Sequence, residues 1–201
     1  MNASFDISES TKRLYRILIL SFFLVCVSNA EAQEKNPKYE FGVLYATLNV
    51  TEKSDKDSGL GFRFTYNVND YLGVEAEETY FPNLREGSEG NERQGLFGVR
   101  AGKRNSRYGV FAKVRPGYTR FYALGRPDLN FFEQDRTRFT VDVGGVFEYY
   151  PHRHLAIRFD AGDTMVRFKP GDFFRQDFNR VFVQKRLSHN LQINVGVALR
   201  F

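Results

Sequence analysis

The sequence predicts an all-β protein, an eight-stranded antiparallel up-and-down transmembrane β-barrel. Three observations predict this fold: segments in which apolar and polar residues alternate, the lengths of those segments, and the lengths of the connections between them. The alternation is most regular in residues 191–201, LQINVGVALRF, where every second residue is apolar. A period of two is the signature of a β-strand with one apolar face. Closing such strands into a barrel pairs both edges of the sheet, which would otherwise invite aggregation.

Eight segments show this alternation, and each has about the length that a tilted strand needs to cross a bilayer. They are residues 38–50, 59–68, 71–81, 95–103, 108–121, 137–150, 155–163 and 187–201. One face is mostly apolar or aromatic and the other carries glycine and charge, which is typical of a barrel with lipid outside and a polar interior. Glu78 departs from this pattern, because it falls on the apolar face. Pro116 lacks the N–H that a strand ladder needs, so we predict a β-bulge there, near the rim with the long loops.

The connections between the predicted strands are alternately long and short. The short ones are residues 69–70, 104–107 and 151–154, and the long ones are 51–58, 82–94, 122–136 and 164–186. In an up-and-down meander this alternation places every tight turn at one end and every long loop at the other. Membrane barrels of the outer-membrane kind have short periplasmic turns and long extracellular loops. We therefore expect that polarity here, with both chain ends on the side of the short turns.

Aromatic residues are frequent where the two membrane interfaces would lie, which is the depth that amphipathic rings prefer. Near the short turns these are Tyr66, Tyr71, Tyr108, Tyr149, Tyr150 and Phe201; near the long loops they are Tyr80, Phe81, Tyr118, Phe121, Tyr122 and Phe139. We expect them to form two girdles around the barrel.

Residues 1–32 have the three parts of a secretory signal peptide. Basic residues precede an apolar run of eleven residues at 17–27, and Ala30-Glu31-Ala32 offers a cleavage site. Eleven apolar residues are too few for a membrane-spanning helix, which needs roughly 20. We therefore expect a signal peptide over 1–32 and a β-barrel domain over 33–201.

Cleavage after residue 32 would remove Cys26, the only cysteine, so the exported chain could form no disulfide. It would also remove three basic and three acidic residues, which leaves the net charge of +5 unchanged. A basic exported protein suggests anionic lipid or polysaccharide as its neighbour. No nucleic-acid-binding motif is present, so we expect no nucleic-acid partner.

With the export signal, the alternating strands and the VGVALRF ending, the chain resembles the small OmpA/OmpX-like outer-membrane β-barrel domain family. Residues 59–81, GLGFRFTYNVNDYLGVEAEETYF, and 145–162, GVFEYYPHRHLAIRFDAG, look like hairpins of that family. The resemblance covers residues 38–201 and implies a location in the bacterial cell outer membrane. It also implies that the barrel-assembly machinery reads the C-terminal assembly signal, which consists of Val195, Val197, Leu199 and Phe201.

The faces opposite the apolar stripes carry a nearly balanced set of charges. We expect an interior salt-bridge network of Glu40, Arg63, Glu75, Glu77, Arg100, Lys113, Arg115, Asp142, Glu148, Arg158, Asp160 and Arg200, with Arg138 also facing inward. Counting register outward from each turn predicts five groups of neighbours. These are Arg63 with Glu75 and Glu77, Arg100 with the same two glutamates, Arg115 with Asp142, Glu148 with Arg158, and Arg200 with Glu40.

Such an interior could conduct ions or solutes, or it could simply be filled by its ion pairs. An eight-stranded barrel is just wide enough for side chains to fill it, which favours the filled interior. Glycines at positions 42, 61, 73, 98, 102, 117, 144, 162 and 196 fit that interpretation, since they would make room for the long arginines.

Catalytic and metal-binding residues are few. His152 and His154 lie in a predicted short turn without a further histidine or cysteine to complete a metal site. Ser188 and His189 are a possible nucleophile and base, but their adjacency in the sequence is only weak evidence for a catalytic pair. Asp160 and Asp163 would face opposite sides of a regular strand and make a poor carboxylate pair. We therefore predict no catalysis, no cofactor and no metal.

The predicted loop 164–186 combines phenylalanines with six basic and two acidic residues, so it could bind lipopolysaccharide phosphates or a partner, or be an ordinary hairpin extension of the barrel. We expect a monomeric outer-membrane barrel with a structural or adhesive role, in contact with outer-membrane lipid and lipopolysaccharide. The alternatives are an enzyme of the same architecture that modifies lipid A, a narrow passive pore, and a secreted soluble barrel with its apolar faces inward.

Overall fold

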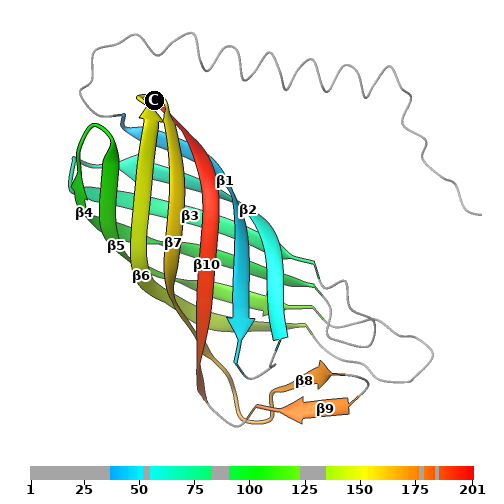
Figure 1. The fold of residues 1–201 in the computed structure, drawn as a ribbon. Coiled ribbons are helices and arrows are strands. Elements are labelled where there is room, and N and C mark those ends of the chain that lie inside the picture. Colours follow the sequence, from blue (N-terminus) through cyan, green and yellow to red (C-terminus); the bar gives the residue numbers. More distant parts are fainter. Residues whose placement is uncertain (1–36, 52–54, 83–90, 123–134, 177–178, 184–185) are drawn as a thin grey trace, which may run out of the picture. The chain divides into compact units, whose positions relative to one another are not determined.

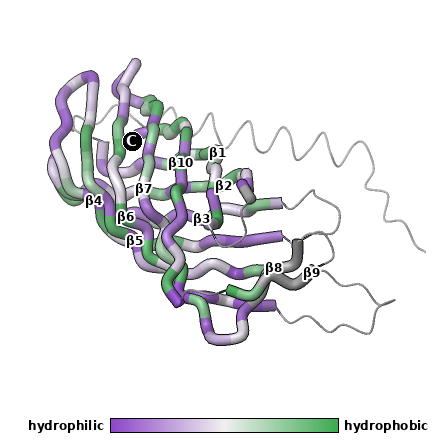
Figure 2. Tube along the Cα trace, turned by 60° about the horizontal axis from the view of Figure 1, so that its bottom comes forward, coloured by the Kyte–Doolittle hydropathy of each residue, from purple (hydrophilic) through white to green (hydrophobic). Residues whose placement is uncertain are grey.

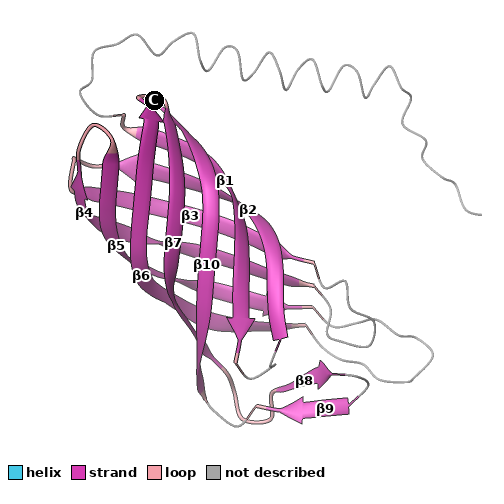
Figure 3. Ribbon diagram, viewed as in Figure 1, coloured by secondary structure: helices cyan, strands magenta, loops and turns pink. Residues whose placement is uncertain are grey.

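The computed structural model describes residues 37–51, 55–82, 91–122, 135–176, 179–183 and 186–201, and its regular elements are all strands (Figures 1 and 3). They are β1 (Tyr39–Val50), β2 (Asp55–Asn67), β3 (Leu72–Phe81), β4 (Glu92–Arg104), β5 (Tyr108–Phe121), β6 (Arg136–His152), β7 (Leu155–Arg167), β8 (Phe173–Gln176), β9 (Asn179–Phe182) and β10 (Leu187–Arg200). In these ranges no helix is both long and apolar enough to span a membrane.

Eight of the strands form a closed antiparallel barrel in the order β1-β10-β7-β6-β5-β4-β3-β2. The barrel closes where β1 pairs with β10, from Glu40 opposite Arg200 to Asn49 opposite Leu191. Backbone hydrogen bonds of 3.0 and 2.8 Å between Tyr39 and Phe201 extend this pairing to the last residue. The predicted eight-stranded barrel is therefore confirmed.

Two of the tight turns are stabilised by asparagine side chains. In the β2–β3 turn, the Asn69 Oδ1 atom accepts hydrogen bonds of 2.8 Å from the backbone N–H groups of Tyr71 and Leu72. In the β4–β5 turn, Asn105 Oδ1 accepts equivalent bonds from Arg107 and Tyr108. Asparagine commonly forms such turns, because its side chain takes the place of a backbone acceptor. The turns set the register of the hairpins on either side.

The tight turns and the longer connections lie at opposite ends of the barrel, as Figure 1 shows for the β4–β5 turn and the β8–β9 hairpin. All four longer connections are shorter than predicted, since β2 begins at Asp55, β4 at Glu92 and β6 at Arg136, and β7 continues to Arg167. Within the region predicted as one loop, β8 and β9 pair with each other as a separate two-stranded sheet. We call the two ends the turn end and the loop end.

The apolar faces of the barrel strands point outward. Phe62 is 73% exposed and Leu60 69%, and Val43, Phe97 and Val110 are also largely exposed. The alternation of hydrophobic and hydrophilic residues along the strands is visible in Figure 2. Because the exposed faces are apolar and the enclosed ones carry most of the charge, this surface is suited to lipid. The alternative of a soluble barrel with an apolar lining is therefore wrong.

The two predicted aromatic girdles are only partly present. Tyr66, Tyr71, Tyr108 and Tyr149 are exposed at the turn end, and Tyr80, Tyr118 and Phe139 are exposed at the loop end. In contrast, Tyr150, Phe81 and Phe121 are buried inside the barrel. The prediction was wrong for these three, because neighbouring residues in a strand point to opposite faces, so Tyr149 and Tyr150 cannot both face lipid.

The β-bulge predicted at Pro116 is also absent. The β4–β5 register is the same before and after the proline, with Leu96 opposite Gly117 and Val99 opposite Val114. The β4–β5 ladder is interrupted between these two pairs, whereas on the other side Pro116 stays paired with Val141 of β6. A local gap in one ladder thus accommodates the missing N–H. The register does shift in the β6–β7 hairpin, between Tyr149 and His152.

Candidate functional site

The interior of the turn-end half of the barrel contains a dense network of charged side chains. All twelve residues of the predicted network lie inside, and the most exposed, Arg63, is only 8% exposed. They come from all eight barrel strands, because each strand contributes every second residue to the interior. Their burial makes pairing necessary, since an unpaired charge in a confined interior is costly.

Ion pairs form within each of the five predicted groups of neighbours. The N···O distances are 2.8 Å for Arg63–Glu77, 3.5 Å for Arg100–Glu75, 2.7 Å for Arg115–Asp142, 3.5 Å for Arg158–Glu148 and 3.2 Å for Arg200–Glu40. The predicted Arg63–Glu75 contact is not among the ion pairs described. Instead, Glu75 accepts hydrogen bonds from Thr65 and from both terminal nitrogens of Arg158. Register alone thus locates neighbours on adjacent strands but does not choose between two acceptors.

Other ion pairs cross the barrel between strands that are not neighbours. Arg158 of β7 forms its two bonds with Glu75 of β3, four strands away around the barrel. Arg100 contacts Glu148 and, at 3.0 Å, Glu40. Further crossing pairs include Arg63–Asp160 at 3.0 Å, Lys113–Asp160 at 3.0 Å and Arg115–Glu77 at 2.7 Å. The network therefore connects opposite walls of the barrel.

One member of the network was missed and one predicted member lies elsewhere. The Arg104 side chain is 3% exposed, lies 3.5 Å from Glu40 and donates a 2.8 Å hydrogen bond to Asn67. Its position two and four residues after inward-facing Gly102 and Arg100 could have revealed it. Arg138 lies at the loop end, where it pairs with Asp172.

Asp172 fastens the segment after β7 to the barrel. Its carboxylate accepts hydrogen bonds from Arg138 and a 2.7 Å bond from the backbone N–H of Lys169. Burial by itself would raise the pKa of Asp172, but these bonds and the positive charge of Arg138 outweigh it, so the pKa is lowered. The carboxylate is therefore ionised at neutral pH and holds this segment through Arg138.

The loop-end half of the interior contains an apolar cluster beside buried threonine, glutamine and asparagine side chains. Leu44, Ala46, Leu48 and Val50 of β1 face inward there, although β1 presents Tyr39, Phe41, Val43 and Tyr45 to the outside. The complete buried cluster is Leu44, Ala46, Leu48, Val50, Phe81, Phe121, Val166 and Phe168. Val183, beyond β9, packs against it. The prediction that salt bridges fill the interior therefore describes only the turn-end half.

Uncharged polar side chains lie between these two halves. Gln192 donates hydrogen bonds to Gln94 and Asn194 and accepts one of 2.9 Å from Thr164. Asn194 in turn donates to Glu77 of the charged network. Gln192 and Asn194 therefore connect the charged network to polar groups nearer the loop end.

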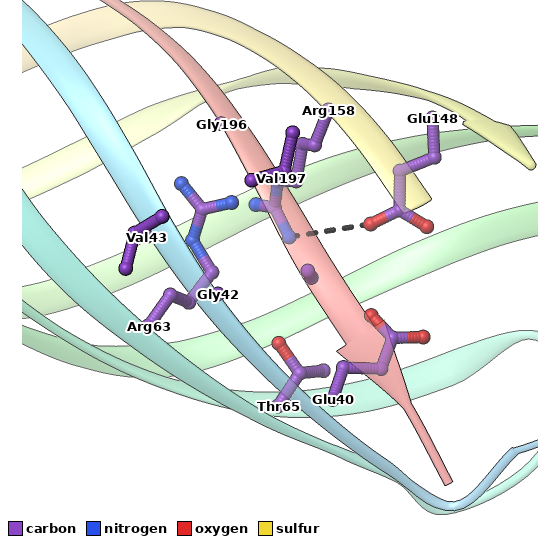
Figure 4. Close-up of a pocket in the computed structure, with 10 residues that line it drawn as sticks. Glu40, Gly42, Val43, Arg63, Thr65, Glu148, Arg158, Gly196 and Val197 are labelled. Atoms are coloured by element: carbon purple, nitrogen blue, oxygen red, sulfur yellow. Dashed lines mark hydrogen bonds and ion pairs between the residues drawn. The ribbon is translucent and has the colours of Figure 1, made fainter. Parts of the chain in front are cut away.

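The charged half leaves little empty space. Figure 4 shows a cavity beside Arg63, Arg158 and Glu148, closed on the other side by Gly42 and Gly196. Its volume is about 10 Å³, room for about one water molecule.

The interior glycines serve mainly the curvature of the wall. Among the nine noted in the sequence, three are cross-strand partners of arginines: Gly42 of Arg63, Gly73 of Arg100 and Gly196 of Arg158. An added Cβ at Gly73 would be 3.1 Å from Arg100 Nε. At Gly98, by comparison, a Cβ would be 2.6 Å from the backbone Cα of Arg115 on the neighbouring strand. The expectation that all nine make room for arginines was therefore wrong, because a narrow barrel brings inner backbones close together.

The residues considered for catalysis do not come together. Ser188 is buried inside, while His189 points outward and contacts Asp163 at 2.6 Å. Asp160 belongs to the interior network, on the opposite face of β7 from Asp163. The Nδ1 atom of His154 contacts the backbone oxygen of Arg200. Among the described residues no group of three or more potential ligands could hold a metal.

The residues of the predicted assembly signal lie at the closing seam of the barrel. Val195 and Val197 are exposed on the outer surface, and Leu199 is opposite Phe41 of β1. Phe201 contacts the ring of Phe41, with centroids 6.5 Å apart. The predicted signal peptide, residues 1–32, lies outside the described residues.

Comparison with known proteins supports the architecture. Residues 17–201 match the family model described as "Outer membrane protein beta-barrel domain". The fold is similar to that of Neisserial surface protein A, with a TM-score of 0.55, 14% identity and coverage of 81% of this chain and 96% of the other. The attachment invasion locus protein Ail of Yersinia pestis has a TM-score of 0.49, also at 14% identity, with the same coverages. No curated protein matches the sequence.

Proposed function

Since this chain belongs to the outer membrane protein β-barrel domain family and lies in the bacterial outer membrane, we propose that it is a non-catalytic surface protein with a closed interior. Its role would be structural or adhesive. The observation that carries the proposal is the filling of the barrel: a charged network in one half, an apolar cluster in the other, and a cavity of about 10 Å³ between side chains. Interaction would then take place on the loops and the outer wall.

The proposed orientation follows from the lengths of the connections. The tight turns would face the periplasm, and the loop end, with the β8–β9 hairpin, would face the exterior. Lipopolysaccharide would be the lipid around the loop end, and the barrel-assembly machinery would act on the seam that ends at Phe201. The protein would function as a monomer, because closure leaves no unpaired barrel edge.

A narrow passive pore is the weaker candidate. Ions would have to pass both the cross-barrel pairs, such as Arg158–Glu75, and the apolar cluster around Leu48 and Phe121. A lipid A-modifying enzyme would require a nucleophile or an activated water beside a base. The outward His189–Asp163 pair offers a base, but the adjacent Ser188 faces the other side of the wall.

Three measurements test the proposal. Purified protein in planar bilayers should give no stepwise conductance, and a reproducible open channel would reject the closed interior.

Mass spectrometry of lipid A from a deletion strain should match the parent strain, whereas a changed acylation or headgroup pattern would support the enzyme. Deletion of residues 170–182 should reduce attachment of cells to host surfaces or to one another while the barrel keeps its heat-dependent electrophoretic mobility. Unchanged attachment would argue against an adhesive role for this hairpin.

A further inference from the structure

Glu78, the charged residue that interrupted the apolar pattern of β3, lies in an unusual part of the outer wall. It belongs to a surface groove of about 460 Å³ that is lined by Leu60, Phe62, Glu78, Tyr80, Asn91, Arg93 and Tyr122. The groove runs over β2, β3 and β4 at their loop ends. A carboxylate on a lipid-facing wall costs free energy, so its presence there requires a compensating interaction.

Arg93 and Tyr118 provide that interaction. Arg93 Nε donates a hydrogen bond to Glu78, and the Tyr118 hydroxyl lies 3.2 Å from both carboxylate oxygens. Tyr118 reaches Glu78 across Gly95, where an added Cβ would be 2.5 Å from the tyrosine ring and 2.8 Å from the carboxylate. Glycine at position 95 is thus required for this arrangement. The three polar groups hold one another in place on the outer surface.

The groove also lies where the outward residues change from apolar to charged. On β4 the outward residues change from Phe97 through Gly95 to Arg93 towards the loop end, and on β5 the last of them is Arg120, which is opposite Arg93. The side chains of Arg93 and Arg120 are 52% and 44% exposed. Arg93 lines the polar end of the groove, whereas the guanidinium of Arg120 beside it pairs with Asp135 at 2.7 Å.

The other wall of the groove is apolar and uncovered. Phe62 and Leu60 are the two most exposed large apolar side chains described on the barrel, at 73% and 69%. Leu60 is opposite Tyr80, and Phe62 is opposite Glu78, one step deeper into the apolar band. An extended hydrocarbon chain would cover both side chains while its headgroup remained beside Arg93.

We propose that this groove retains one molecule of lipopolysaccharide, with a lipid A phosphate bound to Arg93 and an acyl chain lying along Leu60 and Phe62. Guanidinium groups bind phosphate oxygens in a fixed planar geometry, which suits a retained headgroup better than a mobile one. Glu78 orients Arg93 and balances its charge when the groove is empty. The inference rests on the proposed orientation, because lipopolysaccharide surrounds the loop end only if the loops are external.

The test compares lipid retained by the full chain and three variants purified from outer membranes in mild detergent, with bound lipid identified by native mass spectrometry. The wild type should carry one lipopolysaccharide molecule. The fraction of R93Q molecules that carry lipopolysaccharide should be at least about five-fold lower, as expected for loss of a charge-assisted contact. K103Q is the matched control, because Lys103 is an outward-facing residue of β4 at the turn end, and it should retain the lipid. E78Q should also retain it, since Arg93 remains.

Equal loss in E78Q and R93Q would overturn the proposal, because it would show that the ion pair serves only the wall itself. Retention by R93Q, loss in K103Q, or copurification of glycerophospholipid instead of lipopolysaccharide would overturn it as well. Heat-dependent mobility on gels confirms that each variant is a folded barrel.

The orientation is measured separately by labelling intact cells that carry S54C or D70C, in the β1–β2 and β2–β3 connections. Labelling of D70C alone would reject the orientation whatever lipid is bound.

Discussion

The two halves of the barrel interior achieve the same closure by different physical means. The turn-end half is held by ion pairs such as Arg158–Glu75 and Arg115–Asp142, which connect several strands at once. The loop-end half is held by apolar contacts among residues such as Leu48, Phe81 and Phe121. Charged pairs are directional and fail when one partner is removed, whereas apolar packing loses free energy in proportion to the volume removed. The comparison predicts that the two halves respond differently to substitution.

The largest effect is expected in the charged half. E75Q removes the negative charge and one of the two acceptor oxygens that bind Arg158, and it removes a charged neighbour of Arg100 and Arg115. Because it removes one negative charge from a buried network of nearly balanced charge, it should lower the free energy of unfolding by about 3–5 kcal/mol. Urea titration in lipid vesicles measures the change. E78Q is the control on the same strand, since its partly exposed pair should cost about 1 kcal/mol or less; similar losses in both variants would contradict the special role of the interior.

A somewhat smaller loss is expected in the apolar half. L48A removes a fully buried side chain from the cluster. The lost burial and the cavity that remains should cost about 2–4 kcal/mol in the same titration. V43A, on the outer face of the same strand, removes a side chain that contacts lipid and should cost less. If V43A were the more destabilising of the two, the apolar cluster would not be a stabilising core.

Combining the two substitutions tests whether the halves are independent. Glu75 and Leu48 share no contact that is described here, and the uncharged polar layer around Gln192 and Asn194 lies between the charged and apolar residues. The losses for E75Q and L48A should therefore add to within about 0.5 kcal/mol in the double variant. A larger deviation would show that the two halves form a single cooperative unit.

The smallest effect concerns the segment after β7. The lowered pKa of Asp172 means that its contact with Arg138 stabilises the folded state above the ordinary aspartate pKa and is lost as the pH falls through the lower, folded value. Acidification should therefore speed amide hydrogen exchange at Lys169, whose N–H bonds to the carboxylate. D172N should give about tenfold faster exchange at neutral pH and remove most of the acid dependence. An unchanged pH profile in D172N would exclude Asp172 as the titrating group.

Strand number, strand direction and inward-facing residues could be predicted from the sequence because they depend on local patterns. A period of two assigns Arg100 inward and Phe97 outward without knowledge of other strands. Asn69 and Asn105 mark tight turns, and counting outward from a turn places Arg115 beside Asp142. The same alternation places Tyr150, Phe81 and Phe121 inside the barrel, contrary to the predicted girdles.

What the chain determined by itself is therefore the barrel, its two faces and its neighbouring pairs, since alternation and turn length are properties of adjacent residues. Only the tertiary structure decided that Arg158 reaches Glu75, that Pro116 needs no bulge, and that Leu48 and Phe121 meet in an apolar cluster. Contacts across the barrel depend on its closure, diameter and strand tilt. Those are properties of all eight strands together, so no segment of the sequence specifies them alone.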